Sequence, residues 1–130
     1  MKEGMDEFKQ ISTTMVWKLK KEWNINDKEK ISDVKKLYYG LFNSNQIIIA
    51  FICLSIKNNE IFFTIHERKT TQNRTSKILK YLIKKAFVLK IFRLKCNFEE
   101  ENQTIYKQFG FRKRYNSKCA KQLFLLNLKK

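Results

Sequence analysis

The sequence predicts an α+β fold, with a mixed, mostly antiparallel sheet flanked by helices in a single compact domain covering residues 1–130. Three observations favour it. Strand-length apolar runs alternate with short polar turns, one helical apolar stripe lies between two of these runs, and no glycine- or serine-rich linker divides the 130 residues. The apolar fraction of 43% is typical of a globular chain with a substantial core.

The N-terminal part of the chain gives the weakest pattern. Residues 1–12 are polar and are expected to form either a first helix or a frayed end. Apolar residues alternate with lysines over Met15–Lys21, which predicts a half-buried strand. The stretch Asn24–Lys36 is polar again, and Asp27 is a candidate cap for a short helix within it.

The middle of the chain predicts an antiparallel meander of three strands. The runs 37–42 and 46–56 flank Asn43-Ser44-Asn45, and asparagine tolerates the left-handed backbone that tight turns require. The second run is apolar almost throughout, so we expect a central strand. A further turn at 57–59 leads into the third strand, Glu60–Glu67.

A helix follows the meander. Apolar residues recur at helical spacing from Ile78 to Phe87, after a polar loop over 68–75, and Thr75 or Ser76 is a candidate cap. The helix leads into a strand over 91–98. A strand–helix–strand crossover is right-handed and joins parallel strands, so we expect this strand to run parallel to the third strand of the meander.

The C-terminal part predicts a short helix over 101–109 and two final strands, 111–115 and 122–128. The helix ends at Tyr106-Lys107-Gln108-Phe109-Gly110-Phe111. Glycine commonly ends a helix because it adopts left-handed backbone without steric cost. The motif therefore predicts a helix, a glycine turn and a strand, with the tyrosine one turn before the glycine.

Composition limits the classes of function. The net charge is +16, with 23 lysines and 5 arginines, and such a charge attracts polyanions. The longest apolar run, 47–56, is too short to span a membrane, and the N-terminus carries no apolar export signal. Three cysteines form no disulfide or zinc pattern, which favours a reducing cytoplasm, and Cys53 and Cys96 are expected to be buried. With one histidine, His66, a histidine-based metal site is not expected.

The order of elements and the Tyr-x-x-x-Gly-Phe motif resemble the GNAT superfamily of acyl-CoA-dependent N-acetyltransferases. The resemblance covers residues 38–128. The hairpin around Asn43–Asn45 is similar to the family's second and third strands, 65–70 to the end of its fourth strand, and 76–79 to the start of its long helix. It implies an acyl-CoA cofactor, normally acetyl-CoA.

Two positions depart from the family's pattern. Its pyrophosphate loop carries two glycines, where this chain has Asn73 and Thr75. Those glycines allow backbone N–H groups to approach phosphate ahead of a helix. Lysine and arginine side chains nearby could partly offset that loss. The family's asparagine seven residues before the tyrosine is replaced by Glu99, and Asn97 and Asn102 are the nearest substitutes.

The resemblance implies roles for individual residues. Tyr106 would be the general acid for the leaving thiolate, although the alternative is that its ring only packs in the core. Glu60 is the candidate base, with His66 and Glu67 as rivals, and the alternative is a solvated turn residue. The residues expected to contact the cofactor lie at the end of the fourth strand, in the loop and near the second helix: Ile65, Glu67, Asn73, Arg74, Thr75, Ser76, Lys77 and Asn102.

Two functions follow as hypotheses. The first is an acetyl-CoA-dependent N-acyltransferase that modifies an amine of a macromolecule, associated with nucleic acid or acidic in character. The second is a degenerate, non-catalytic fold that binds nucleic acid or protein. The residues that could grip nucleic acid are Lys80, Lys84, Lys85, Arg112, Lys113 and Arg114, and the alternative is a solvated basic surface. The oligomeric state stays open.

Overall fold

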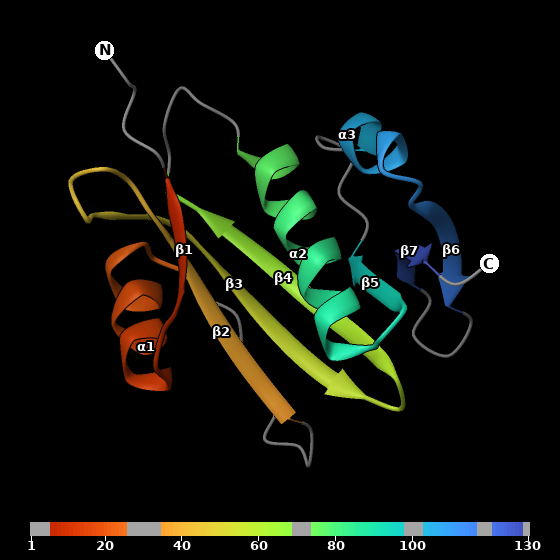
Figure 1. Cartoon of the computed structure of the whole chain (residues 1–130), viewed down its shortest axis with the longest axis horizontal. Coiled ribbons are helices and arrows are strands. Elements are labelled where there is room, and N and C mark those ends of the chain that lie inside the picture. Colours follow the sequence, from red (N-terminus) through yellow and green to blue (C-terminus); the bar gives the residue numbers. More distant parts are fainter. Residues whose placement is uncertain (1–5, 26–34, 69–73, 98–102, 117–120, 129–130) are drawn as a thin grey trace.

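The computed structural model describes residues 6–25, 35–68, 74–97, 103–116 and 121–128, and the side chains of 115, 116 and 121–124 are not described. One seven-stranded sheet has the strand order β1-β2-β3-β4-β5-β7-β6 (Figure 1). Only β4 and β5 pair in parallel; the other neighbours in this order are antiparallel. The predicted fold class and the crossover between parallel strands are confirmed. The helix considered at Asp27 lies outside the described residues.

The elements in chain order are β1 Glu7–Gln10, α1 Thr13–Glu22, β2 Lys35–Phe42, β3 Ile48–Lys57, β4 Glu60–Glu67, α2 Thr75–Leu89, β5 Arg93–Asn97, α3 Gln103–Gln108, β6 Arg112–Asn116 and β7 Lys121–Asn127.

Both hairpins of the meander form where the asparagines indicated them. At the first turn, the Asn43 side-chain oxygen accepts hydrogen bonds from the N–H groups of Asn45 and Ile47, and the residue with left-handed backbone is Gln46 (φ 63°). At the second turn, Asn58 and Asn59 both have positive φ, 53° and 61°. Two consecutive left-handed residues match the twist of antiparallel strands, so this is the tight turn that sets the β3–β4 register.

The prediction of a strand over Met15–Lys21 is wrong, because this stretch belongs to helix α1. Ser12 caps the helix by accepting a hydrogen bond from the Met15 N–H at 3.1 Å. The buried residues are Val16 and Leu19, three positions apart, whereas Trp17 is 66% exposed. The apparent alternation with lysines was therefore coincidental, and the helical spacing decides which face is buried.

Residues 7–10 are neither helical nor frayed: they form the edge strand β1, paired with β2 through Glu7↔Phe42 to Gln10↔Tyr39. Phe8 stacks on Tyr81 of α2 with ring centroids 4.0 Å apart. A four-residue strand with one anchoring aromatic gives too short a pattern to recognise in sequence.

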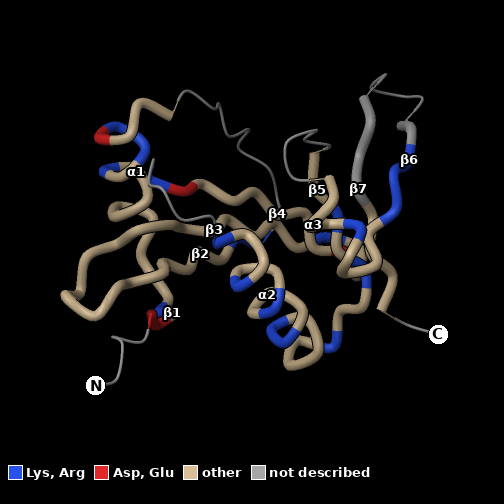
Figure 2. The backbone as a smooth tube through the Cα atoms, turned by 90° about the horizontal axis from the view of Figure 1, so that it is seen from above, with Lys and Arg blue, Asp and Glu red and all other residues tan. Residues whose placement is uncertain are grey.

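The two faces of the sheet carry separate cores. Helices α2 and α3 pack on one face, over a main core that includes Ile61, Phe63, Leu94 and Leu126. Helix α1 packs on the other face, over a second core that includes Phe51. Figure 2 shows α1 and α2 on opposite sides of β3 and β4.

Helix α2 buries most of its predicted stripe: Ile78, Leu79, Leu82 and Ala86. Phe87, expected in that stripe, is 52% exposed. It comes nine positions after Ile78, and at 3.6 residues per turn this rotates it away from the buried stripe. Thr75 and Ser76 do not cap the helix: they are its first two residues, and the cap position is Arg74.

Cys53 and Cys96 are buried, as predicted. None of the helices in the described part of the chain combines the length and apolar character needed to cross a bilayer.

Candidate active site

The strands β4 and β5 separate along their length. Within the described residues, they pair through Glu60↔Arg93, Ile61↔Leu94 and Phe62↔Lys95, at the start of each strand, and at no later position. The rest of β4, Phe63 to Glu67, pairs with β3 alone among the described strands. Figure 1 shows the two strands diverging toward their carboxyl ends, between the start of α2 and α3. Parallel strands that part in this way leave backbone N–H and C=O groups on one edge of β4 available to a ligand.

The N-terminus of α2 lies at the end of that opening and is occupied by Glu67. One Glu67 oxygen accepts a hydrogen bond from the Arg74 N–H at 2.9 Å, and the other accepts from the Thr75 hydroxyl at 3.0 Å. Thr75 is fully buried. A carboxylate at this position is favourable because the first N–H groups of a helix have no partner within it and carry partial positive charge.

A second carboxylate, Asp6, neutralises the side chains at the same place. Its Oδ2 lies 3.1 Å from the Arg74 Nε and 3.5 Å from the Lys77 Nζ. The side chains of Asp6 and Arg74 are mostly buried. Two of the three cations expected to receive a cofactor phosphate, Arg74 and Lys77, are therefore already paired with a carboxylate of the chain itself. The third, Lys69, lies outside the described residues.

Tyr106 lies at the other side of the opening, on α3, and is 4% exposed. Its ring packs edge-on against Phe111 with centroids 5.3 Å apart, and Phe111 packs edge-on against Phe63 of β4 at 5.9 Å. This aromatic row fixes α3 against the middle of β4. The Tyr106 ring therefore packs in the core. Its role as a general acid stays a prediction, and so does the alternative that its ring only packs.

The turn after Tyr106 has the predicted form. Gly110 has φ 96°, in the region that side chains rarely adopt, and the Phe111 N–H donates to the Tyr106 carbonyl at 3.1 Å. The glycine therefore ends α3 and directs the chain into β6.

Glu60 and Tyr106 are not brought together. Successive residues of a strand point to opposite faces. Ile61 belongs to the main core with Tyr106, so Glu60 faces the other side of the sheet. There its carboxylate lies 3.2 Å from Arg93 and 3.1 Å from Lys95. His66 shares that face of β4, and its ring is tilted against Phe51 at 4.9 Å.

The predicted cofactor residues gather only in part. Glu67, Arg74, Thr75 and Lys77 meet at the junction of β4 and α2, where Ser76 is exposed. Ile65 packs against the edge of the main core. Asn73 and Asn102 lie outside the described residues. Sequence reasoning missed Asp6, because its partner Arg74 is 68 positions away and the short strand β1 that carries the chain there gives no strong pattern.

The predicted nucleic-acid contacts fall into two separate groups. Lys80 and Lys84 are exposed on α2, and the Lys85 ammonium lies over the Tyr39 ring at 4.9 Å from its centroid. Arg112, Lys113 and Arg114 are exposed on β6. Figure 2 shows basic residues on α1, α2 and β6, so the positive charge is not confined to one side of the molecule.

Solved structures share this architecture from end to end. An acetyltransferase of the GNAT family from Staphylococcus aureus Mu50 has a TM-score of 0.71 at 17% identity and covers 96% of this chain and 100% of its own. The ribosomal-protein-S18-alanine N-acetyltransferase from Escherichia coli has a TM-score of 0.70 at 12% identity, covering 97% and 96%. The chain has the GNAT fold.

A spermidine N-acetyltransferase variant from Vibrio cholerae is also similar, with a TM-score of 0.70 at 10% identity over 92% of each chain. No protein-family model matches the sequence, and no curated protein matches it. At these identities the similarity establishes the fold, and the predicted resemblance is confirmed at that level.

Proposed function

We propose that this GNAT-fold chain is an N-acyltransferase that takes its acyl group from acetyl-CoA or another acyl-CoA. The observation that carries the proposal is the divergence of β4 from β5 next to α3, in a fold shared with acetyltransferases. The free edge of β4 could bind a thioester, and Tyr106 lies on α3 at the other side of the opening.

Acyl transfer to an amine needs a polarised carbonyl and a leaving group that can accept a proton. Backbone N–H groups of β4 around Ile65, beyond the last pair with β5, are the candidate donors to the thioester oxygen. Tyr106 is the candidate acid: its hydroxyl would donate its proton to the departing CoA thiolate. A positioned acid of this kind contributes about 10²- to 10⁴-fold in rate. Glu60 is a weak candidate for the base, because two cations hold it on the other face.

The cofactor's pyrophosphate would sit at the N-terminus of α2 and would have to replace internal carboxylates. In the described part of the chain the cations at this place are Arg74 and Lys77, and both contact Asp6. Thr75 is helical with negative φ, so this position does not need the left-handed backbone that glycine provides. Binding is therefore coupled to movement of Asp6 and Glu67 away from the helix terminus.

The acceptor we propose is an amine of a macromolecule that is acidic or associated with nucleic acid. The net charge of +16 supports this choice, since it raises the local concentration of polyanions around the protein. A cytoplasmic location fits Cys53 and Cys96, which are thiols and not members of a disulfide in the described part of the chain.

A second candidate function is a non-catalytic binding module built on the same fold. The specific observation in its favour is the pairing of Glu67 and Asp6 with the groups that would otherwise bind pyrophosphate. If that pairing is permanent, the fold keeps the opening but cannot accept acyl-CoA.

Thermal unfolding with and without acetyl-CoA separates the two candidates. A ligand at 100 times its Kd adds about 2.7 kcal/mol to the free energy of unfolding. The acyltransferase proposal expects a clear rise in Tm that saturates with acetyl-CoA, and a smaller one with CoA fragments lacking the pyrophosphate. An unchanged Tm at millimolar acetyl-CoA would contradict it and favour the binding module.

A further inference from the structure

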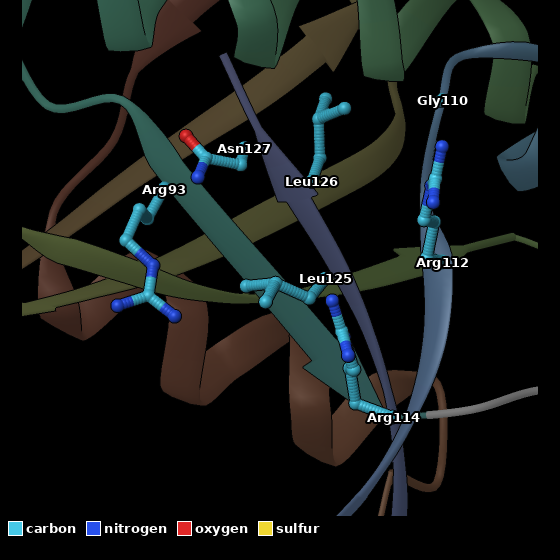
Figure 3. A pocket seen from close by; sticks show the side chains of 7 residues that line it. All are labelled: Arg93, Gly110, Arg112, Arg114, Leu125, Leu126 and Asn127. Atoms are coloured by element: carbon cyan, nitrogen blue, oxygen red, sulfur yellow. The ribbon is translucent and has the colours of Figure 1, made fainter. Parts of the chain in front are cut away.

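Three of the chain's five arginines line a single pocket. The pocket has a volume of about 510 Å³ and lies over β5, β7 and β6. Figure 3 shows Arg93 extending from β5 and Arg112 and Arg114 from β6, with β7 between them. Lysines outnumber arginines 23 to 5 in this sequence, so the concentration of guanidinium groups here is not explained by composition.

Strand register brings these arginines to one face. Leu94 and Leu126 are paired and both point into the main core. Their neighbours Arg93 and Asn127, also paired, must point the opposite way. Leu125 shares that face, and Arg112 pairs with Leu125. Arg114 follows two positions later on β6, so all three arginines lie on the face of the sheet opposite α2.

The positive charge of the pocket is only partly neutralised. Glu60 contacts Arg93 at 3.2 Å, and it is shared with Lys95. Among the residues that the structure describes, no carboxylate lies within ion-pair distance of Arg112 or Arg114, and both are exposed. Two guanidinium groups are thus available to an external anion, with Arg93 beside them.

Guanidinium groups bind phosphate and carboxylate through two parallel N–H donors, which an ammonium group cannot do. Alternate residues of a strand are about 6.6 Å apart, so Arg112 and Arg114 suit two neighbouring anionic groups of one chain better than a single anion. Leu125 adds an apolar surface and Asn127 an amide at the same pocket. A single-stranded nucleic acid has this combination, because its phosphates follow one another along the backbone and each sugar carries a base with an apolar face.

We propose that this pocket binds the phosphodiester backbone of a single-stranded nucleic acid. The site would hold the acceptor of the proposed acyltransferase, and only that role rests on the proposed function, because binding itself requires no acyl-CoA. It also lies on the opposite face of the sheet from α2, so the two ligands would not compete for space.

The test measures fluorescence anisotropy of a labelled single-stranded oligonucleotide of about 12 nucleotides, without acyl-CoA, over a range of salt concentrations. The variant Arg112→Ala/Arg114→Ala is compared with Lys80→Ala/Lys84→Ala, which removes the same charge from exposed positions on the other face. We expect the arginine variant to bind about 10- to 100-fold more weakly. Its salt slope should fall by about 1.4, at 0.7 for each lost phosphate contact. The lysine variant should lose less than about threefold.

A second variant separates geometry from charge. Arg112→Lys/Arg114→Lys keeps the charge but removes the bidentate donors. We expect weaker binding with an unchanged salt slope. Circular dichroism checks that each variant is folded, and the lysine-for-arginine variant serves if the alanine variant is not.

Three results would overturn the proposal. Equal losses in the arginine and lysine variants would show that binding follows overall charge. A glutamate peptide of equal charge that binds as tightly would point to an acidic protein, and an equally tight mononucleotide would point to a small ligand. The two proposals can fail separately. If the oligonucleotide binds but acetyl-CoA does not raise the Tm, the acyltransferase proposal is wrong and the nucleic-acid site stands.

Discussion

Positive charge is neutralised differently in two regions of the molecule, the start of α2 and the β5–β7–β6 end of the sheet. At the start of α2, Arg74 and Lys77 are paired with Asp6, and Glu67 accepts from the Arg74 N–H and the Thr75 hydroxyl. At the β5–β7–β6 end, Arg93, Arg112 and Arg114 line a pocket. Glu60 contacts Arg93 there, and among the described residues no carboxylate forms an ion pair with Arg112 or Arg114. An internal carboxylate competes with an external phosphate for the same donors. An anion that binds at the start of α2 must therefore displace a carboxylate of the chain. An anion that binds to Arg112 and Arg114 displaces none among the described residues.

The largest expected effect concerns Tyr106. Tyr106→Phe keeps the ring that packs against Phe111 and removes the hydroxyl. We expect kcat to fall by about 10²- to 10⁴-fold, since the thiolate loses its proton donor, while acyl-CoA affinity stays within about twofold. Steady-state kinetics and a cofactor titration measure the two quantities. Full turnover in the phenylalanine variant would assign Tyr106 to packing alone.

Gly110 joins α3, which carries Tyr106, to β6, which carries Arg112 of the arginine pocket. Gly110→Ala would place a side chain on a backbone with φ 96°, and its Cβ would lie 3.2 Å from the Leu126 Cδ1. We expect a loss of about 1–2 kcal/mol in the free energy of unfolding, measured by urea denaturation. An unchanged midpoint would show that the turn relaxes without cost.

The smallest effect concerns the carboxylates themselves. Asp6→Asn/Glu67→Gln removes the charges that compete with pyrophosphate at Arg74 and Lys77. We expect acetyl-CoA to bind about 3- to 10-fold more tightly, because its pyrophosphate no longer has to displace a charged carboxylate from these groups. Calorimetric titration measures this affinity.

The matched control for that variant is Glu7→Gln/Glu22→Gln, which also removes two negative charges but at exposed positions outside α2. Its affinity should stay within about twofold of the parent. Weaker binding in Asp6→Asn/Glu67→Gln would show that the carboxylates organise the cofactor site rather than compete for it.

Local sequence signals predicted much of the fold. Asparagine turns predicted two hairpins, and apolar residues at helical spacing predicted α2. Gly110 predicted the end of α3. Helix α1 was missed because Met15, Trp17 and Leu19 alternate by chance with lysines, although Val16 and Leu19 carry the burial.

The site was less accessible to sequence reasoning because it depends on long-range pairing. The loop residues could be located from the family pattern, but nothing local indicates that Asp6 reaches Arg74 or that Glu67 turns back onto the next helix. The arginine pocket likewise depends on the register of β5, β7 and β6, which places Arg93 and Arg112 on one face. Such register is set by packing across the whole sheet.

The central claim is that the opening between β4 and β5 accepts an acyl-CoA thioester. A crystal structure grown with acetyl-CoA tests it most directly. We expect cofactor density along Phe63–Glu67, with Asp6 and Glu67 displaced from the α2 terminus and the Tyr106 hydroxyl within about 3.5 Å of the sulfur. An empty opening at saturating acetyl-CoA, with both carboxylates still in place, would contradict it.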